Sequence, residues 1–374
     1  MGLHKPTFRQ TAKKYIDNII FTTIKSISSP IAAAENKIKE AGPLVVNKPP
    51  VNATMLPEPF IERFTRPTPC PQQIVYELEN ARVAWHGSVV KGLRVFVPSL
   101  PYPFLEPEFG GLFLLRQFKS HTIPNWDGPV GLIFDNWSIG NYYHWIAEAL
   151  PRLILLRRVK PDCLILLPGP TPPMYVTRTV KALGFDRTYI MSPGEILNVP
   201  RLHVPALPGL YGCIIPEYVK DVRKAILEDV QSEMGIIPVP KRRVYVSRSM
   251  QKWRQLTNES ELLELLEFYE FEVVYFEKMS FIEQVIIMQE TQVFLTIHGA
   301  NMTNMLFLPD ESKAIEILSE DNINPSYLYM ANSIGLNYYC IPAILDSAKK
   351  MPSNYADMKV DVNLIDEFLL SLLN

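Results

Sequence analysis

Apolar and polar positions alternate most clearly between residues 241 and 342 of this sequence. Short runs rich in β-branched and aromatic residues, typical of strands, are separated by segments with apolar residues at helical spacing. The predicted strands are RRVYVSRS, FEVVYFE, QVFLTI, KAIEIL and NYYCI, and the predicted helices are NESELLELLEFY, SFIEQVIIMQE and PSYLYMANSIG. Ser280 and Glu283 have the spacing of a capping box, and Asn258 and Glu261 come close to it. This order predicts a doubly wound parallel sheet.

A second, less regular alternation lies between about residues 74 and 212. The apolar runs RVFVPSL, VGLIFDN and CLILLP alternate with the helical stretches YYHWIAEALPRLILLRR and MYVTRTVKALG. A chain of 374 residues also exceeds the size at which one hydrophobic core usually stops growing. We therefore expect two α/β domains, over residues 74–235 and 236–345.

The remaining segments have patterns of their own. Residues 1–41 include isoleucines at helical spacing beside lysines, which predicts an amphipathic helix that packs on the protein or on a partner subunit or, alternatively, contacts a membrane surface. Residues 42–73 are rich in proline and predict an extended linker. Residues 346–374 end in VNLIDEFLLSLLN, whose apolar positions share one face and predict a docked helix.

Composition and charge exclude several classes of protein. Apolar residues make up 47% of the chain and charged residues 20%, as in ordinary globular proteins, and a net charge of -2 gives no argument for nucleic-acid binding. No apolar run is long enough to span a bilayer, and the N-terminus lacks signal-peptide features. The four cysteines have no CxxC spacing, which favours buried free thiols in a reducing compartment. We expect a cytoplasmic protein, with a membrane surface as its alternative location.

A polar loop follows the predicted strand QVFLTI. The carboxyl end of a parallel strand is where open α/β sheets bind ligands. Gly299 and Ala300 allow the backbone to approach a ligand, and a helix starting near Asn301 or Thr303 would direct its amide groups toward an anion. His298 could donate to the same anion. The alternative is a tight strand-to-helix turn with a hydrogen-bonded histidine.

Three further side chains are expected at the same edge of the sheet. Arg248 follows a strand, Arg254 comes six residues later, and arginine binds phosphate oxygens with a planar fork. Glu316 lies near the end of KAIEIL, where a carboxylate could accept both ribose hydroxyls. The alternatives are solvated surface arginines and, for Glu316, an ion pair with a nearby base.

A possible general base lies in the first domain. His144 and Glu148 are four residues apart, so they share one face of a helix and could act as base and orienting partner. Pro151 should kink or restart that helix. Asp135, at a strand end, is a reserve candidate for the base. A core histidine capped by a carboxylate is the alternative.

Several of these motifs, in this order, resemble glycosyltransferase family 61. The C-terminal motifs are SRS, then Arg254, Asn258 and Glu259, then HGANMTNMLFLP and AIEI. The N-terminal motif is NYYHWIAEALPRL, with an Asn, a His three residues later and an acidic residue four after that. The resemblance spans roughly residues 135 to 342.

This resemblance implies a GT-B architecture, in which two Rossmann-like domains face each other across a cleft. The C-terminal domain would hold a nucleotide sugar, with Asn304 among the loop residues at the donor. The N-terminal domain would meet the acceptor, with Asn141 and Tyr143 on that side. Family members are inverting transferases of hexoses or pentoses, many use UDP-sugars, and bacterial relatives are associated with capsule or lipopolysaccharide synthesis. The C-terminal helix would cross back to the first domain.

The sequence departs from the family pattern at two positions. Asn301 stands where the family usually has Gly, and Glu148 stands where many relatives have Asp. The sequence also contains no DxD motif. We therefore predict that the leaving diphosphate is stabilised without metal or other cofactor, by Arg248, Arg254 and His298 together with the loop amides.

The predicted function is an inverting, metal-independent transfer of a sugar from a nucleotide donor, of the UDP kind, to a hydroxyl of a glycan. The alternatives are a non-catalytic protein that binds nucleotide sugars or glycans, and a nucleotide-sugar hydrolase in which water replaces the acceptor. A dehydrogenase is disfavoured because no GxGxxG follows any strand.

Overall fold

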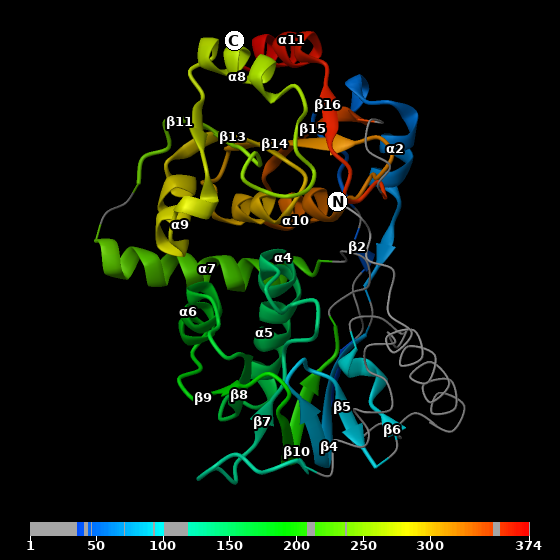
Figure 1. The fold of residues 1–374 in the computed structure, drawn as a ribbon, viewed down its shortest axis with the longest axis vertical. Helices are drawn as coiled ribbons and strands as arrows, with labels where there is room; N and C mark the ends of the chain where they lie inside the picture. Colours follow the sequence, from blue (N-terminus) through cyan, green and yellow to red (C-terminus); the bar gives the residue numbers. More distant parts are fainter. Residues whose placement is uncertain are drawn as a thin grey trace, which may run out of the picture. The chain divides into compact units, whose positions relative to one another are not determined.

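A computed structural model gives the fold of this chain (Figure 1). It describes residues 36–40, 44–45, 47–70, 72–92, 94–100, 119–207, 214–235, 238–346 and 352–373. The chain divides into two compact units, of which unit 1 holds residues 1–41 and 72–207, and unit 2 holds residues 42–71 and 208–374. The helix predicted near the N-terminus lies outside the described residues. None of the described helices has the length and apolarity needed to cross a membrane.

Unit 2 is built on a six-stranded sheet whose order is β12-β11-β13-β14-β15-β16. The first five strands are parallel and β16 is antiparallel to β15. Their bounds are β11 Arg242–Val246, β12 Glu272–Val274, β13 Thr291–Ile297, β14 Lys313–Ser319, β15 Asn337–Leu345 and β16 Met358–Val360. The predicted parallel α/β sheet is therefore present in this part of the chain, as is the α/β fold class.

Helices cover both faces of this sheet, as Figure 1 shows. One face carries α8 and α11, which contact each other, and the other carries α7, α9 and α10, with α7 in contact with both of its neighbours. Their bounds are α7 Pro216–Met234, α8 Glu259–Phe268, α9 Phe281–Gln289, α10 Ser326–Ile334 and α11 Val362–Leu373, and short 3₁₀ helices span Phe276–Lys278 (η6) and Ala300–Phe307 (η7). Apolar residues of β13, β14 and β15 alternate toward α8 and α11, which seals that side of the core.

Two capping predictions have different outcomes. Ser280 and Glu283 form the predicted capping box at the start of α9. Asn258 precedes α8 but makes no capping bond to it. Its side chain instead donates to the carbonyl of Val360 and accepts from the amide of the same residue, at 3.0 and 3.2 Å. Asn258 therefore ties strand β16 to the start of α8.

The proline-rich segment is not the extended linker that we predicted. It contains a helix, α2, at Glu58–Thr65, together with the 3₁₀ helix η1 at Ala53–Met55 and the two-stranded pair β2 (Leu44–Val45) and β3 (Thr68–Pro69). Proline is tolerated in the first turn of a helix, and Phe60 and Phe64 give α2 a buried face one turn apart. The segment belongs to unit 2, where the ring of Phe64 packs edge-on against Tyr338 and Asn52 pairs with the backbone of Cys340.

The C-terminal helix also differs from its prediction. Instead of crossing back to the first domain, α11 packs on the sheet of unit 2 through Ile365, Phe368 and Leu369. The hydroxyl of Tyr269 donates to Asp366 at 2.6 Å and holds α11 against α8. The apolar residues of α11 are therefore buried against the face of the unit 2 sheet that also carries α8.

The expected boundary near residue 235 shifts as well. Helix α7 packs against α9 and α10, so that residues 214–235 belong to unit 2. Arg223 of α7 donates to the carbonyls of Leu306 and Leu308 at 2.9 and 2.7 Å. These bonds attach α7 to the end of η7.

Unit 1 has a mixed sheet with the order β6-β5-β4-β10-β7-β8-β9, and β1 pairs with β4. Its strands are β1 Asn36–Glu40, β4 Gln73–Ala84, β5 Val89–Lys91, β6 Arg94–Val95, β7 Val130–Gly131, β8 Leu164–Pro168, β9 Thr188–Met191 and β10 Ile196–Pro205. Among the described strands of unit 1, only β10, β7, β8 and β9 are parallel to one another. The expected Rossmann-like pattern is limited to that half, because β4 and β10 pair in a long antiparallel ladder with one partly exposed face.

The α-helices of unit 1 connect its parallel strands, and a short 3₁₀ helix follows the antiparallel strand β6. Between β7 and β8 the chain forms α4 (Tyr142–His144), a π-helix labelled η5 (Trp145–Ala149) and α5 (Leu150–Val159); α6 is Met174–Ala182 and η2 is Val97–Ser99. Pro151 falls in the first turn of α5, which agrees with the predicted restart of the helix there.

The cysteines correct another expectation. Cys163 and Cys340 are free and buried, as predicted. Cys70 is disulfide-bonded. The prediction of free thiols is therefore wrong for Cys70, and the argument for a reducing compartment loses that support, because disulfides persist mainly in oxidising ones. The cytoplasmic location stays a prediction.

Candidate functional site

In unit 2 the predicted donor residues gather where the strand order reverses. Strand β11 lies between β12 and β13, so the chain runs outward in opposite directions from the β11 and β13 pair. Such a reversal is the topological switch point at which open α/β sheets bind ligands. Arg248 follows β11 and His298 follows β13, both at the carboxyl ends of their strands.

Arg248 is a buried cation without an acidic partner. It is 5% exposed, and among the described residues no carboxylate lies within ion-pair distance of it. Its Nη2 donates to the carbonyl of Trp253 over a long 3.4 Å, and its Nε has no hydrogen-bond partner in the described part of the chain. Burial and the neighbouring charge of Arg254 lower the pKa of Arg248 to about 10. Arg254 also has a buried Nε without a partner among the described residues.

Gly299 is required by the position of Arg248. A Cβ atom on residue 299 would lie 2.2 Å from Nη1 of Arg248, well inside van der Waals contact. The missing side chain therefore lets the guanidinium lie directly against the loop backbone. On the other side of the loop, the hydroxyl of Tyr327 donates to the carbonyl of Gly299 at 2.6 Å.

His298 is held from behind by a carboxylate. Its Nδ1 faces Glu316, whose other oxygen accepts from the hydroxyl of Tyr338. Glu316 is fully buried and both its oxygens are occupied. The expectation that Glu316 accepts ribose hydroxyls is therefore not met, and the alternative of an ion pair with a nearby base describes it. With Nδ1 engaged, only Nε2 of His298 can reach a ligand.

The loop after His298 forms the predicted helix, which begins at Ala300 and is a 3₁₀ helix. Asn301 is half-buried and its Nδ2 is a buried donor without a partner among the described residues. Thr303 and Asn304 are buried in the interior, and Asn304 donates to Gln284 at 3.2 Å. Ala300 and Asn301 thus lie nearest the surface of the loop, while Thr303 and Asn304 support it from inside.

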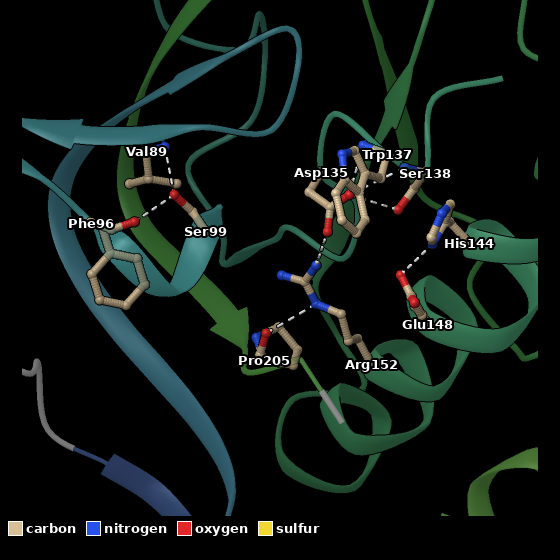
Figure 2. A network of polar contacts seen from close by, with 10 residues as sticks. All are labelled: Val89, Phe96, Ser99, Asp135, Trp137, Ser138, His144, Glu148, Arg152 and Pro205. Atoms are coloured by element: carbon tan, nitrogen blue, oxygen red, sulfur yellow. Dashed lines mark hydrogen bonds and ion pairs between the residues drawn. The ribbon is translucent and has the colours of Figure 1, made fainter. Parts of the chain in front are cut away.

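In unit 1 the predicted base and its partner are in contact. Nδ1 of His144 lies 2.8 Å from Oε2 of Glu148, and the two side chains are 21% and 17% exposed (Figure 2). A carboxylate accepts hydrogen bonds, so Nδ1 carries the proton and Nε2 is the open acceptor. Burial lowers the pKa of His144, but the hydrogen bond to Glu148 and the charges of Glu148 and Asp135 outweigh it, so that the pKa is raised above 6.5.

The helix that carries this pair has an unusual geometry. The π-helical turn covers Glu148, and such turns occur often at functional sites. Asn141 caps the helix by accepting from the backbone amide of His144 at 3.4 Å. The ring of Tyr143 lies 5.3 Å from that of His144 and the ring of Trp137 lies 5.1 Å from it. The imidazole is therefore flanked by two aromatic rings.

Asp135 is not placed to act as the reserve base. It is 1% exposed, and its Oδ1 accepts from the amides of Trp137 and Ser138 at 2.9 and 3.1 Å and from the hydroxyl of Ser138 at 3.1 Å. Its Oδ2 pairs with Arg152 at 3.5 Å. With both oxygens engaged and no access to solvent, Asp135 has a structural part in the site.

We also searched the described residues for side chains that could coordinate a metal ion. Across the described ranges, no group of three or more His, Cys, Asp and Glu side chains is placed to hold a metal ion.

The sequence motifs and the geometry point to the same family. Residues 142–315 match the family described as Glycosyltransferase 61. Residues 142–315 are thus similar to that family, and the match covers slightly less than half of the 374-residue chain. The predicted resemblance is thus confirmed, and the family supports the prediction that the chain is a glycosyltransferase. His144, Glu148, Arg248, Arg254 and the loop from His298 to Asn304 lie inside the family 61 region, whereas Asp135 and Glu316 lie outside it.

Curated relatives agree with this family 61 assignment over shorter stretches. The chain is 35% identical over 97 residues to the EGF domain-specific O-linked N-acetylglucosamine transferase of Drosophila melanogaster, which covers 25% of this chain and 18% of that protein. It is 30% identical over 101 residues to the Mus musculus protein of the same name, which covers 26% of this chain and 19% of the relative. The chain thus matches less than a fifth of the length of these relatives.

Sequence reasoning missed four residues of these two clusters: Tyr327, Tyr338, Trp137 and Arg152. Tyr327 had a usable signal, because it lies in the first turn of the helix after β14, at the same edge of the sheet as the loop. Tyr338 and Arg152 act from within the core, and no local pattern marks a core tyrosine or arginine as a partner of a distant carboxylate.

Proposed function

We propose that this protein transfers a sugar from a nucleotide donor of the UDP kind to a hydroxyl group of a glycan acceptor, with inversion and without a metal ion. The observation that carries the proposal is the buried charge of Arg248, which lies beside a second arginine at the switch point of a parallel sheet and has no acidic partner among the described residues. An unpaired buried cation is costly, and a bound diphosphate would relieve that cost.

The donor site would work through fixed positive groups. Arg248 and Arg254 would bind the diphosphate oxygens, with the amides of the loop after Gly299 at close range. Because Glu316 engages Nδ1 of His298, Nε2 is the ring nitrogen that would donate to the leaving phosphate, in the doubly protonated form of the ring. The absence of a DxD motif from the sequence is consistent with a donor site built from cations rather than from a metal.

The acceptor step would use the pair in unit 1. Nε2 of His144 takes the proton from the acceptor hydroxyl, whose oxygen forms a bond to the anomeric carbon of the sugar. The bond from that carbon to the phosphate oxygen breaks, and its electron pair leaves with the nucleoside diphosphate. Attack opposite to the leaving group inverts the configuration, and Glu148 stabilises the imidazolium that forms.

This mechanism requires that unit 2, which binds the donor, and unit 1, which carries the base, act on the same donor and acceptor molecules. We propose that they meet in the reacting complex in the manner of a GT-B enzyme, as the resemblance implies. The names of the relatives make an N-acetylglucosamine donor the first to test. For the acceptor, glycans and folded EGF-type domains are the two groups to compare.

The test is calorimetric titration of the protein with UDP, GDP and CDP in the presence of a chelator, with Arg248→Ala as the variant and Arg242→Ala as its matched control. Arg242 is also on β11 but is paired with Glu272 and Glu290 on the surface. We expect selective UDP binding that Arg248→Ala weakens severely and that Arg242→Ala leaves unchanged. Absence of nucleotide binding by the unsubstituted protein would contradict the donor site and favour a glycan-binding protein.

A second measurement separates transfer from hydrolysis. UDP release from UDP-N-acetylglucosamine is followed with and without the acceptor panel. A transferase shows release that rises with acceptor and depends on His144. Release that no acceptor stimulates would favour the nucleotide-sugar hydrolase.

A further inference from the structure

A buried ion pair in unit 1 lies directly behind the candidate base. Asp135 and Arg152 are each 1% exposed, and Nη1 of Arg152 lies 3.5 Å from Oδ2 of Asp135. Nε of Arg152 donates to the carbonyl of Pro205, at the end of β10, at 3.0 Å. The pair thus joins the turn after β7, helix α5 and strand β10, as Figure 2 shows.

This pair is a poor device for stability alone. The contact between Arg152 and Asp135 is long, and Nη2 of Arg152 is buried without a hydrogen-bond partner among the described residues. Buried ion pairs are often no better for stability than apolar residues of the same volume, and an unsatisfied buried donor is costly. The geometry of the Asp135–Arg152 pair is better explained by the turn that the pair holds in place.

The element that it holds is a turn that ends in Trp137. Oδ1 of Asp135 accepts three hydrogen bonds from Trp137 and Ser138, so the turn is closed around the carboxylate. Gly87 comes so near that a Cβ on it would lie 2.5 Å from the carbonyl oxygen of Phe134, which fixes the turn from the other side. The Trp137 ring then lies against the His144 ring, with 5.1 Å between centroids.

We propose that Asp135 is the positioning residue of the His144–Glu148 pair. Its carboxylate, fixed by Arg152, orders the Trp137 turn against His144 and holds the imidazole with Nε2 open toward the acceptor. Asp135 touches neither substrate nor His144 itself, so it acts through Trp137 and through its charge. The inference rests on the proposed function, because it assigns a task to the base of that reaction.

The charges around His144 support this arrangement. Among the described residues, those that act on it are Glu148 on its own helix and Asp135 on the neighbouring turn, and both raise its pKa. Arg152 in turn interacts with both of these carboxylates. Removal of the Asp135 charge should therefore lower the pKa of His144.

The test compares Asp135→Asn with Ser99→Ala. Ser99 is an equally buried residue of unit 1, bonded to the amide of Val89 and the carbonyl of Phe96, and it lies away from His144 (Figure 2). The first measurement is an NMR titration of labelled histidine side chains, which needs no activity and involves only six histidines. The second is the pH profile of sugar transfer, together with UDP affinity.

We expect Asp135→Asn to lower the pKa of His144, to move the acidic limb of the kcat profile to lower pH, and to reduce kcat on the order of 100-fold, because a small displacement of a base has that effect. UDP affinity should not change. Ser99→Ala should lower Tm without moving either the pKa or the limb. If Asp135→Asn leaves both the pKa of His144 and kcat as they were, the proposal is wrong.

A second variant covers the case in which Asp135→Asn does not fold. Trp137→Ala leaves the buried pair intact and removes only the ring that contacts His144. We expect a folded protein with an altered His144 resonance and reduced kcat; an unaltered resonance with full kcat would overturn the proposal. If the protein transfers no sugar at all while the NMR shifts occur as described, the proposed function fails and the positioning of His144 stands.

Discussion

At the scale of single residues, Glu148 decides which nitrogen of His144 can act. Its carboxylate engages Nδ1 at 2.8 Å and so leaves Nε2 as the proton acceptor. Glu316 does the same to His298 in unit 2, where Nδ1 is again the engaged atom. Each histidine thus has Nδ1 engaged and Nε2 open. Nε2 of His144 is expected to accept a proton, whereas Nε2 of His298 is expected to donate one.

The pH dependence of transfer follows from the raised pKa of His144. A general base works in its neutral form, so the rate should fall as the pH drops through a value above 6.5. Glu148→Gln removes the charge that raises this pKa, and the acidic limb should then move to lower pH while kcat falls. His144→Ala should lose about 10²- to 10⁴-fold in kcat.

The measurement is kcat against pH from 5 to 9 for the protein and both variants, with UDP affinity as the control. Full activity of both variants would exclude this pair as the base.

The raised pKa of His144 also affects folding stability. The contribution of His144 to the free energy of unfolding is fully present at pH values below the unfolded pKa of about 6.5, and it is lost as the pH rises through the folded pKa.

Gly299 offers a separate residue-scale prediction. In Gly299→Ala the new methyl group would lie 2.2 Å from Nη1 of Arg248, so the guanidinium must move. We expect UDP binding to weaken about tenfold or more, which is about 1.4 kcal/mol. Titrations of both single variants and the double variant with Arg248→Ala form the cycle that isolates the contact. Because the displaced group is then absent, the double variant should bind UDP no more weakly than Arg248→Ala; additive losses would refute this explanation.

At the scale of elements, helix α11 completes the core of unit 2. Phe368 is 4% exposed and its ring lies 5.6 Å from that of Tyr339 on β15. Phe368→Ala should therefore cost about 3–5 kcal/mol of unfolding free energy, the usual cost of a phenylalanine removed from a core. Leu370, on the same helix, is 55% exposed, and Leu370→Ala should change stability by less than about 0.5 kcal/mol.

Denaturant unfolding of both variants gives this comparison directly. Equal losses would mean that α11 does not pack through the face that contains Phe368. The result also bears on the earlier expectation for this helix, because a tail that crossed to the first domain would leave the sheet face of unit 2 uncovered.

At the scale of the whole molecule, the state of the cysteines gives a prediction that can be tested by counting free thiols. The chain has four cysteines, of which Cys163 and Cys340 are free and Cys70 is disulfide-bonded. Burial raises the pKa of Cys163 to about 12, so it should not react in the folded protein. We expect thiol titration of the unfolded, unreduced protein to detect two thiols, and four after reduction. Four thiols without reduction would restore the prediction of free cysteines.

The sequence by itself determined the strands and helices between residues 241 and 342 and the edge of the sheet at which Arg248 and His298 meet. These follow from local information: hydrophobic period, the Ser280 cap and the rule that parallel strands end at one edge. The His144–Glu148 pair was equally accessible, because four residues on a helix share a face.

Only the tertiary structure decided which side chains and backbone groups these residues contact. The contacts of Glu316 with His298, of Asp135 with Arg152 and of Arg152 with Pro205 join residues that are 18, 17 and 53 positions apart in the chain. The docking of α11 and the inclusion of α2 in unit 2 depend on which apolar surface of the folded chain their apolar residues pack against. Periodicity shows that a face is apolar but not what covers it, because that choice is made by long-range packing.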